Sequence, residues 1–301
     1  MLLSARTEAT LPRREPAVGP VVAAIAAAAA ATAGALADAV PGHPEGVARR
    51  LFAEALGGAD VAAIAWPDRE EPEPRRRGAA LVLALTPLEG ADDLDGGMPA
   101  GTIFSLRPAG TDPADAFRAS GRTQVAAGFV TYGPRTLLTL TDGTATTTRI
   151  LDPRSGAFRP PVSLCIRETS PRGGPDATRR GETAPTDWTS SLASLSAGAQ
   201  RVLTHGGLHL RPADIGHDRD AGGVRLVHAA APVALAIEAA GGTATDGRGR
   251  AILDLATDDL HRRTPLAVGS PREVASLLRR LDAARDAGGS PLFAPRGLLR
   301  A

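Results

Sequence analysis

Residues 80–106 read ALVLALTPLEGADDLDGGMPAGTIFSL: an apolar run, a short acidic turn and a second apolar run. The first run, 80–85, has the length and character of a buried strand, and so does the second, 101–106. Between them, the segment 86–90 (TPLEG) contains Pro and Gly, which end a strand and turn the chain. The stretch therefore predicts two buried strands, with polar side chains gathered where the first one ends.

The acidic turn concentrates negative charge. Glu89, Asp92, Asp93 and Asp95 place four carboxylates within seven residues. Oxygen ligands this close together suit a hard cation such as Mg²⁺, which relieves their mutual repulsion. The alternative is an acidic surface turn that binds nothing. The chain contains no P-loop, dinucleotide fingerprint or zinc-protease helix that would indicate another chemistry.

Composition limits the classes of protein to which the chain can belong. Its 301 residues are 43% hydrophobic with a formal net charge of +1, which allows a large core but no strong overall attraction to nucleic acid or membrane. The single Cys165 excludes an intrachain disulfide and a Cys-rich zinc site. Segment 21–40 is mostly Ala and contains Asp38, so we expect a packed helix of a cytoplasmic protein and no membrane span.

The flanking segments alternate between helical and strand patterns. Upstream, a helix is expected after Pro44, ending at Gly57-Gly58, followed by a buried strand at 61–64. Residues 67–77 (PDREEPEPRRR) predict a solvated loop, and Trp66 just before it is expected to be a packing residue.

Downstream, the pattern stays mixed. Residues 124–132 fit either a helix or a strand, because periodicity alone does not separate the two. Asp142-Gly143 between two β-rich runs predicts a hairpin, and residues 168–187 predict a loop. The remaining elements are expected as helices at 190–202, after Pro232 and after the capping residue Ser270, and as a strand at 224–227. This alternation predicts layers of helices and sheets.

Several motifs together resemble the class 1 fructose-1,6-bisphosphatases. That family carries Asp-Pro-Leu-Asp-Gly-Ser-Ser-Asn-Ile-Asp followed by Gly-Thr-Ile-Phe, and this chain has TPLEGADDLD at 86–95 followed by GTIF at 101–104. The likeness runs from about residue 20 to 285 in the family's order. Its further pieces are QVAAG at 124–128, LDP at 151–153, EAAGG at 238–242 and DDLHRRTP at 258–265.

The resemblance implies an α/β fold, a layered α-β-α-β-α sandwich of the fructose-1,6-bisphosphatase and inositol monophosphatase type, usually a homotetramer. It implies Mg²⁺-dependent hydrolysis of fructose 1,6-bisphosphate to fructose 6-phosphate and phosphate, in gluconeogenesis or the Calvin cycle. The domain division expected with it is a flexible segment at 1–19, an N-terminal half at 20–165, a loop at 166–188 and a C-terminal half at 189–301.

Matching the family's motifs position by position identifies candidate site residues. The metal ligands implied are the Leu88 carbonyl and Glu89, and the catalytic residues implied are Glu45 and Asp95. The substrate-binding residues implied are Glu89, Gly90, Ala91, Asp92, Arg167 and Arg225.

Other positions of the family's site carry uncharged residues here. Thr86 stands for the first metal aspartate, the segment 64–66 for the paired metal glutamates, and Ala229 for a later glutamate. Two hypotheses follow. In one, Asp68, Glu70 or Glu71 replaces the missing ligands and the chain is an active phosphatase. In the other, the chain is a non-catalytic relative that binds a sugar phosphate or pairs with an active paralogue.

Overall fold

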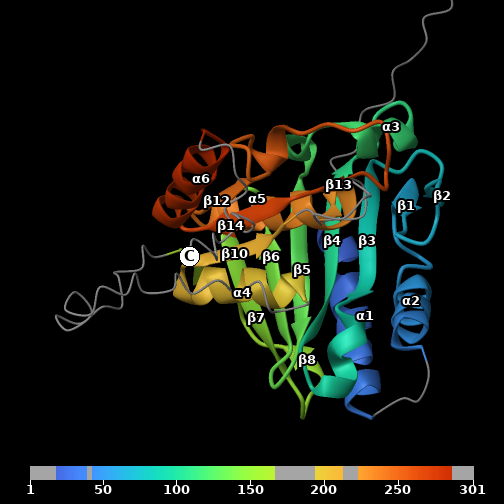
Figure 1. Ribbon diagram of the computed structural model, residues 1–301. Helices are drawn as coiled ribbons and strands as arrows, with labels where there is room; N and C mark the ends of the chain where they lie inside the picture. The colour runs from blue at the N-terminus through green and yellow to red at the C-terminus, as the bar shows by residue number, and fades with distance from the viewer. Residues whose placement is uncertain (1–17, 39–42, 167–193, 213–222, 287–301) are drawn as a thin grey trace, which may run out of the picture.

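The structure is a computed structural model that describes residues 18–38, 43–166, 194–212 and 223–286 (Figure 1). The expected loop at 168–187, the flexible segment at 1–19 for the most part, and Arg167 lie outside these residues.

A mixed sheet forms the centre of the fold (Figure 1). Its strands follow the order β2-β1-β3-β4-β5-β6-β7-β8, and β9 pairs with β7. Only β1 and β3 pair in parallel, so the chain leaves both strands toward the same edge of the sheet. The strands are β1 (Ala63–Ala65), β2 (Glu73–Pro74), β3 (Leu81–Glu89), β4 (Ala100–Pro108), β5 (Ala126–Tyr132), β6 (Leu137–Thr141), β7 (Thr146–Asp152), β8 (Ala157–Phe158) and β9 (Val162–Leu164).

Helices and a second sheet complete a five-layer sandwich (Figure 1). Helices α1 and α2 cover one face of the large sheet, and α4 and α5 cover the other. Behind α4 and α5 lies the small antiparallel sheet β10-β14-β12, which α6 covers on its far side. The bounds are α1 (Val18–Ala37), α2 (Pro44–Ala55), α4 (Leu195–His205), α5 (Ala231–Ala239), α6 (Pro271–Asp286), β10 (Leu208–Arg211), β12 (Thr243–Thr245) and β14 (Leu266–Gly269).

Short elements connect these layers. The pair β11 (Val224–Arg225) and β13 (Arg263–Thr264) forms a small ladder of its own. The remaining short helices are α3 (Pro113–Arg118), the 3₁₀ turns η1 (Ala91–Gly96), η2 (Gly121–Thr123) and η5 (Ile252–Asp254), and the π-helix η4 (Leu226–Ala230).

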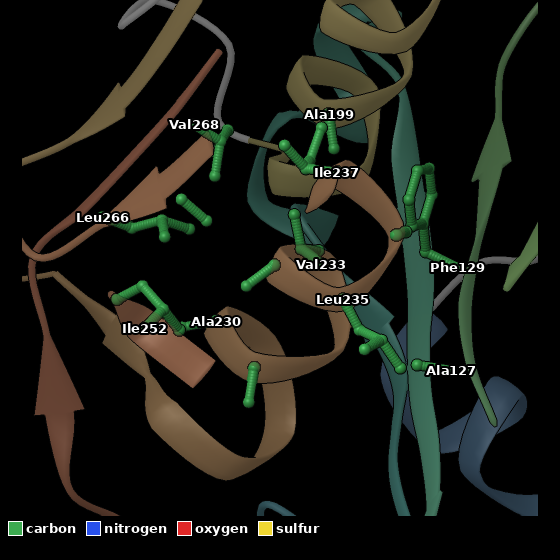
Figure 2. Packing of buried hydrophobic residues seen from close by; sticks show 14 of the residues in the cluster. Ala127, Phe129, Ala199, Ala230, Val233, Leu235, Ile237, Ile252, Leu266 and Val268 are labelled. Atoms are coloured by element: carbon green, nitrogen blue, oxygen red, sulfur yellow. The ribbon is translucent and has the colours of Figure 1, made fainter. Parts of the chain in front are cut away.

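Helix α5 lies in the middle of the sandwich and is apolar on every side. Figure 2 shows Leu235 directed at Ala127 of the large sheet, while Val233 and Ile237 extend between α4 and the small sheet. All but the last two residues of this helix are buried. A helix that is buried all round needs no polar face, which explains the run APVALAI. The layered α/β fold expected from the sequence is therefore confirmed.

Several local predictions are confirmed as well. Residues 124–132, which fitted a helix or a strand, contain strand β5, and Asp142-Gly143 joins β6 to β7 in a hairpin. Helix α1 is long and apolar enough to cross a membrane by length and composition. It packs on the large sheet through one face that includes Val21 and Ile25, as expected for a packed helix.

Other local predictions are wrong in detail. The charged loop at 67–77 contains strand β2, which pairs with β1 and makes the segment a hairpin. The strand expected at 224–227 ends at Arg225, because the next residues form the π-helix η4. Helix α6 begins at Pro271 as expected, but the buried hydroxyl of Ser270 has no hydrogen-bond partner in the described chain and does not cap it.

Candidate functional site

The TPLEG segment ends strand β3 with a break in register. The β3–β4 ladder is regular up to Thr86 and resumes at Glu89, which faces Gly101. The hydroxyl of Thr102 donates to the carbonyl of Pro87 at 2.6 Å and holds this irregularity in place. Gly90 then turns the chain at a φ of +71°, which a residue with a side chain rarely adopts. This β-bulge changes the direction in which the Glu89 side chain points relative to the residues before it in β3.

The carboxylate of Glu89 sits at the N-terminus of helix α4. Its Oε1 accepts hydrogen bonds from Ser194 Oγ at 2.6 Å, Ser196 Oγ at 2.8 Å and Ser196 N at 3.0 Å. Its Oε2 accepts one from Leu195 N at 2.8 Å. These amides belong to the helix end that carries unpaired N–H groups and partial positive charge, where an anion is stabilising. Glu89 therefore joins the large sheet to the C-terminal part of the chain.

The packing around this contact leaves no room for larger residues. A Cβ placed on Gly90 would lie 3.0 Å from the Cβ of Ser194. A Cβ placed on Gly101 would lie 2.6 Å from the carbonyl oxygen of Val130 and would collide with Ser196 Oγ. The two glycines thus let the first turn of α4 approach the ends of β3 and β4.

The neighbouring positions at which the family has metal ligands carry uncharged residues here, and their side chains make other contacts. The Thr86 hydroxyl donates to the carbonyl of His228 at 3.2 Å, and Ala229 follows in the same π-helix. Trp66, which follows β1, is 1% exposed, and its indole Nε1 donates to Glu73 Oε2 at 3.0 Å. Trp66 is therefore a packing residue, as expected, at a place where the family's pattern has acid.

Two arginines approach the segment that follows β1 from different elements. The guanidinium of Arg49, from α2, lies over the Trp66 ring with its carbon 3.3 Å from the ring centroid, and its Nε is 3.7 Å from Asp68 Oδ1. Arg225, from β11, donates from Nη1 to the carbonyl of Pro67 at 2.8 Å. Burial lowers the pKa of Arg225, and the nearby Arg263 lowers it further, whereas Asp68 opposes both.

His228 lies behind this segment as a neutral, buried side chain. It is 1% exposed, and burial lowers its pKa to about 3, with Arg225 and His261 acting in the same direction. Its ring stacks with that of His261 at a centroid separation of 6.3 Å. The carbonyls of Ala65 and Leu260 lie near, but neither ring nitrogen makes a hydrogen bond of normal geometry within the described chain.

The candidate residues lie on several different elements. Glu45 lies exposed in the first turn of α2, and Asp92 and Asp95 are exposed in η1. Ala91 is half-buried in the same 3₁₀ turn, and the Leu88 side chain is buried at the end of β3. Arg167 lies outside the described residues.

The divalent cation implied by the resemblance does not fit the residues that the structure places here. Within residues 18–38, 43–166, 194–212 and 223–286, no group of three or more His, Cys, Asp or Glu side chains could hold a metal. Asp68, Glu70 and Glu71 belong to these residues and form no such group with Glu89. Glu89 itself directs both oxygens at α4, and Thr86 uses its hydroxyl on a carbonyl.

Sequence reasoning missed Arg49 as a site residue. Its helix carries Arg50 as the next residue, and nothing in the local pattern separates the arginine that lies on Trp66 from the one that pairs with Glu54 on the surface. The only available signal is Trp66 itself, since an aromatic residue next to a charged loop is a common cation–π partner.

Comparisons with known proteins agree on one family. The family described as "Fructose-1-6-bisphosphatase, N-terminal domain" matches residues 49–160, and "Fructose-1-6-bisphosphatase, C-terminal domain" matches residues 180–282. The chain is 45% identical over 285 residues to a fructose-1,6-bisphosphatase class 1 of Methylobacterium sp. (strain 4-46), covering 88% of this chain and 86% of that protein. It is 40% identical to the class 1 protein of Methylobacterium radiotolerans, covering 84% of this chain and 79% of the other.

A solved structure shows the same fold. The crystal structure of Leishmania major fructose-1,6-bisphosphatase in its T-state superposes with a TM-score of 0.76 at 22% identity. The match covers 91% of this chain and 95% of that one. The holo form of the same protein gives a TM-score of 0.74.

Proposed function

Because this chain belongs to the class 1 fructose-1,6-bisphosphatase family, we propose that it binds a sugar phosphate of the fructose bisphosphate type but does not hydrolyse it by the family's metal-dependent route. Membership of the family implies a divalent metal cofactor and a sugar-phosphate ligand. The chain has the fold of a solved fructose-1,6-bisphosphatase, and its described residues contain no group of three or more acid, Cys or His side chains that could hold a cation, which supports the proposal.

One observation carries this proposal. Glu89, the only acid at the TPLEG segment itself, accepts four hydrogen bonds from the first turn of α4. Phosphoryl transfer in this family needs several carboxylates to hold cations that polarise the phosphoryl group and activate water. With Glu89 engaged and Thr86, Trp66 and Ala229 uncharged, the described residues offer no such set.

Fructose-1,6-bisphosphatase activity is the second candidate, favoured by the identity of 45% to a relative of that name. Under this hypothesis Glu89 releases α4 and binds Mg²⁺ together with the carbonyl of Leu88. Glu45 and Asp95 would then act on the attacking water and on the metal site.

A phosphate-release assay with purified protein separates the two candidates. Fructose 1,6-bisphosphate is supplied over a titration of Mg²⁺, and its binding is measured in parallel by calorimetry with the metal chelated by EDTA. Binding in EDTA without release at any Mg²⁺ concentration supports the first proposal. Release that rises with Mg²⁺ and disappears in Glu89→Ala contradicts it and supports the second.

We also propose a cytoplasmic location and an oligomeric state. Membership of the family implies a homotetramer, and a mixed oligomer with an active paralogue is the alternative. The single cysteine and the packing of α1 on the sheet are compatible with the cytoplasm. Light scattering of the purified chain, alone and mixed with an active paralogue, tests the assembly.

A further inference from the structure

We propose that Arg49 and Arg225 bind a phosphate group directly, without a metal, and that Asp68 is the counter-ion which the phosphate displaces. This inference rests on the proposed binding of a sugar phosphate and names the residues that hold it. The site is the turn 66–69, which follows β1 and is called the Trp66–Arg69 turn below. Arg49 and Arg225 contact this turn from α2 and β11, next to the segment 64–66, where the resemblance implies metal-binding glutamates.

Three elements hold the Trp66–Arg69 turn in a defined place. Arg49 of α2 lies over the Trp66 ring, and Arg225 of β11 donates to the carbonyl of Pro67 at 2.8 Å. On the third side, His261 Nε2 lies 3.0 Å from the carbonyl oxygen of Arg69. Both arginines also lie near Asp68 of this turn, since Arg49 Nε is 3.7 Å from Asp68 Oδ1, and the charge of Asp68 opposes the lowering of the Arg225 pKa by burial.

Both arginines have donor groups that their protein neighbours leave unused. Arg49 Nε is buried and makes no hydrogen bond within the described chain; Asp68 Oδ1 lies 3.7 Å from it, and Glu73 Oε2 lies 3.5 Å from Nη2 of the same guanidinium. Arg225 uses one of its five N–H groups on Pro67, its only hydrogen bond among the described residues. A buried unpaired donor is costly, and a bound anion would satisfy it.

Arg263 adds a second positive charge next to Arg225. Arg225 and Arg263 are direct cross-strand partners in the β11–β13 ladder, an arrangement that destabilises a sheet unless an anion lies between or beside them. Glu73 is already bound by Arg75 at 2.8 Å and by the Trp66 indole. Glu73 also lies 3.5 Å from Arg49 Nη2, but among the described residues Asp68 is the carboxylate that acts on both Arg49 and Arg225.

Asp68 is well suited to be displaced. Its side chain is 63% exposed and lies 3.7 Å from Arg49 Nε, beyond hydrogen-bonding distance. An exposed ion pair of this kind contributes little free energy, so a phosphate with more charge and more acceptor oxygens can replace it. Arginine is the residue best shaped for such a contact, because its planar fork binds two phosphate oxygens at once. The position also agrees with the tendency of ligands to bind beyond the carboxyl ends of parallel strands.

The test is calorimetric binding of inorganic phosphate, fructose 6-phosphate and fructose 1,6-bisphosphate, all in EDTA. We expect saturable binding to the unchanged protein, at least tenfold weaker binding to Arg49→Gln and to Arg225→Gln, and severalfold tighter binding to Asp68→Asn. Arg50→Gln is the matched control, because it removes a neighbouring guanidinium of α2 that pairs with Glu54 instead, and its affinity should be unchanged.

Outcomes separate this inference from the proposed function. If fructose 1,6-bisphosphate binds in EDTA but Arg49→Gln, Arg225→Gln and Asp68→Asn all bind as the unchanged protein does, the sugar phosphate lies elsewhere and the arginine site is wrong. If no phosphate compound binds with or without Mg²⁺, both proposals fail. Melting curves without ligand identify variants that no longer fold. Should Arg49→Gln unfold, Arg225→Gln and Asp68→Asn still decide, since the first must weaken binding and the second must tighten it.

Discussion

Glu89 ends strand β3 and Asp68 follows its parallel neighbour β1, yet the surroundings of the two acids are opposite. Glu89, at the end of β3, accepts four hydrogen bonds and ties α4 to the sheet. Asp68, after β1, is 63% exposed and lies near two arginines without a hydrogen bond of its own to either. An acid at the end of a strand therefore does not by itself indicate a cation site. The groups that contact the carboxylate decide whether it stabilises the fold, as Glu89 does, or forms a weak ion pair that another anion can replace, as Asp68 does.

Removing the Glu89 carboxylate gives the largest expected effect on this comparison. Glu89→Ala should lower the free energy of unfolding by about 3 to 4 kcal/mol, because it leaves the N–H groups at the start of α4 without their charged acceptor. Glu89→Gln, which keeps an acceptor oxygen, should lose about half of that. Urea denaturation measures both.

The control for this change is Asp92→Ala, which removes an exposed carboxylate three residues away and should alter stability by less than about 0.5 kcal/mol. If Glu89→Ala and Asp92→Ala were equally stable, Glu89 would not hold α4. A Glu89→Ala protein that kept its stability but lost Mg²⁺-dependent phosphate release would identify Glu89 as a metal ligand.

Adding a methyl group at Gly101 tests how closely α4 fits the same place. Gly101→Ala should destabilise the protein by about 2 to 3 kcal/mol, because the new Cβ meets Val130 O at 2.6 Å and collides with Ser196 Oγ. Gly133→Ala is the matched control, since a Cβ there meets only Pro99 at 3.6 Å, an ordinary contact. Equal melting temperatures for the two variants would show that α4 can move away from the sheet.

The lowered pKa of His228, which lies beside the Trp66–Arg69 turn, predicts that the protein loses stability in acid. Its pKa is about 3 in the folded chain against 6.5 when unperturbed, with the charged Arg225 and the ring of His261 facing it. Between pH 6.5 and pH 3 the His228 side chain is protonated in the unfolded chain but neutral in the folded chain. The free energy of unfolding therefore falls as the pH is lowered from 6.5 toward 3. The fall is about 1.4 kcal/mol per pH unit, or about 2 kcal/mol at pH 5.

His228→Phe removes the titrating group while keeping a flat ring in a place where neither nitrogen has a hydrogen-bond partner in the described chain. The variant should therefore gain about 2 kcal/mol over the unchanged protein between pH 7.5 and pH 5 in urea denaturation. At pH 7.5 the histidine is neutral in both states, which supplies the reference. A stability difference that stays constant over this range would mean that His228 has the same pKa in the folded chain as in the unfolded chain.

The layers of the fold were readable from the sequence because they depend on local patterns. The apolar runs at 80–85 and 101–106 lie largely in strands β3 and β4, and Asp142-Gly143 forms the predicted hairpin turn between β6 and β7. Residues 124–132 were ambiguous, because a strand between two covered faces is apolar on both sides and loses its alternation.

The site residues could be predicted from the sequence only by matching the motifs of the family position by position. Glu89 was identified as a site residue, but Ser194, which binds it, lies 105 residues further along the chain. No local pattern reports a contact at that separation. Arg49 carried no signal either, since its contact with Trp66 depends on how α2 packs beside β1. Which side chains meet is decided by tertiary packing, and the spacing of residue types does not record it.

The smallest expected effect on stability comes from changing Asp68, the exposed acid of the pair. Asp68→Asn should change the free energy of unfolding by less than about 0.5 kcal/mol, because an exposed ion pair with water as its alternative contributes little. Any change should also vanish in 1 M NaCl, where charges are screened over roughly 3 Å. Glu54→Gln, which breaks the exposed pair with Arg50 on α2, should behave in the same way. A loss from Asp68→Asn as large as that from Glu89→Ala would show that Asp68 holds the turn in place, and an acid that holds the turn cannot be the one that a phosphate displaces.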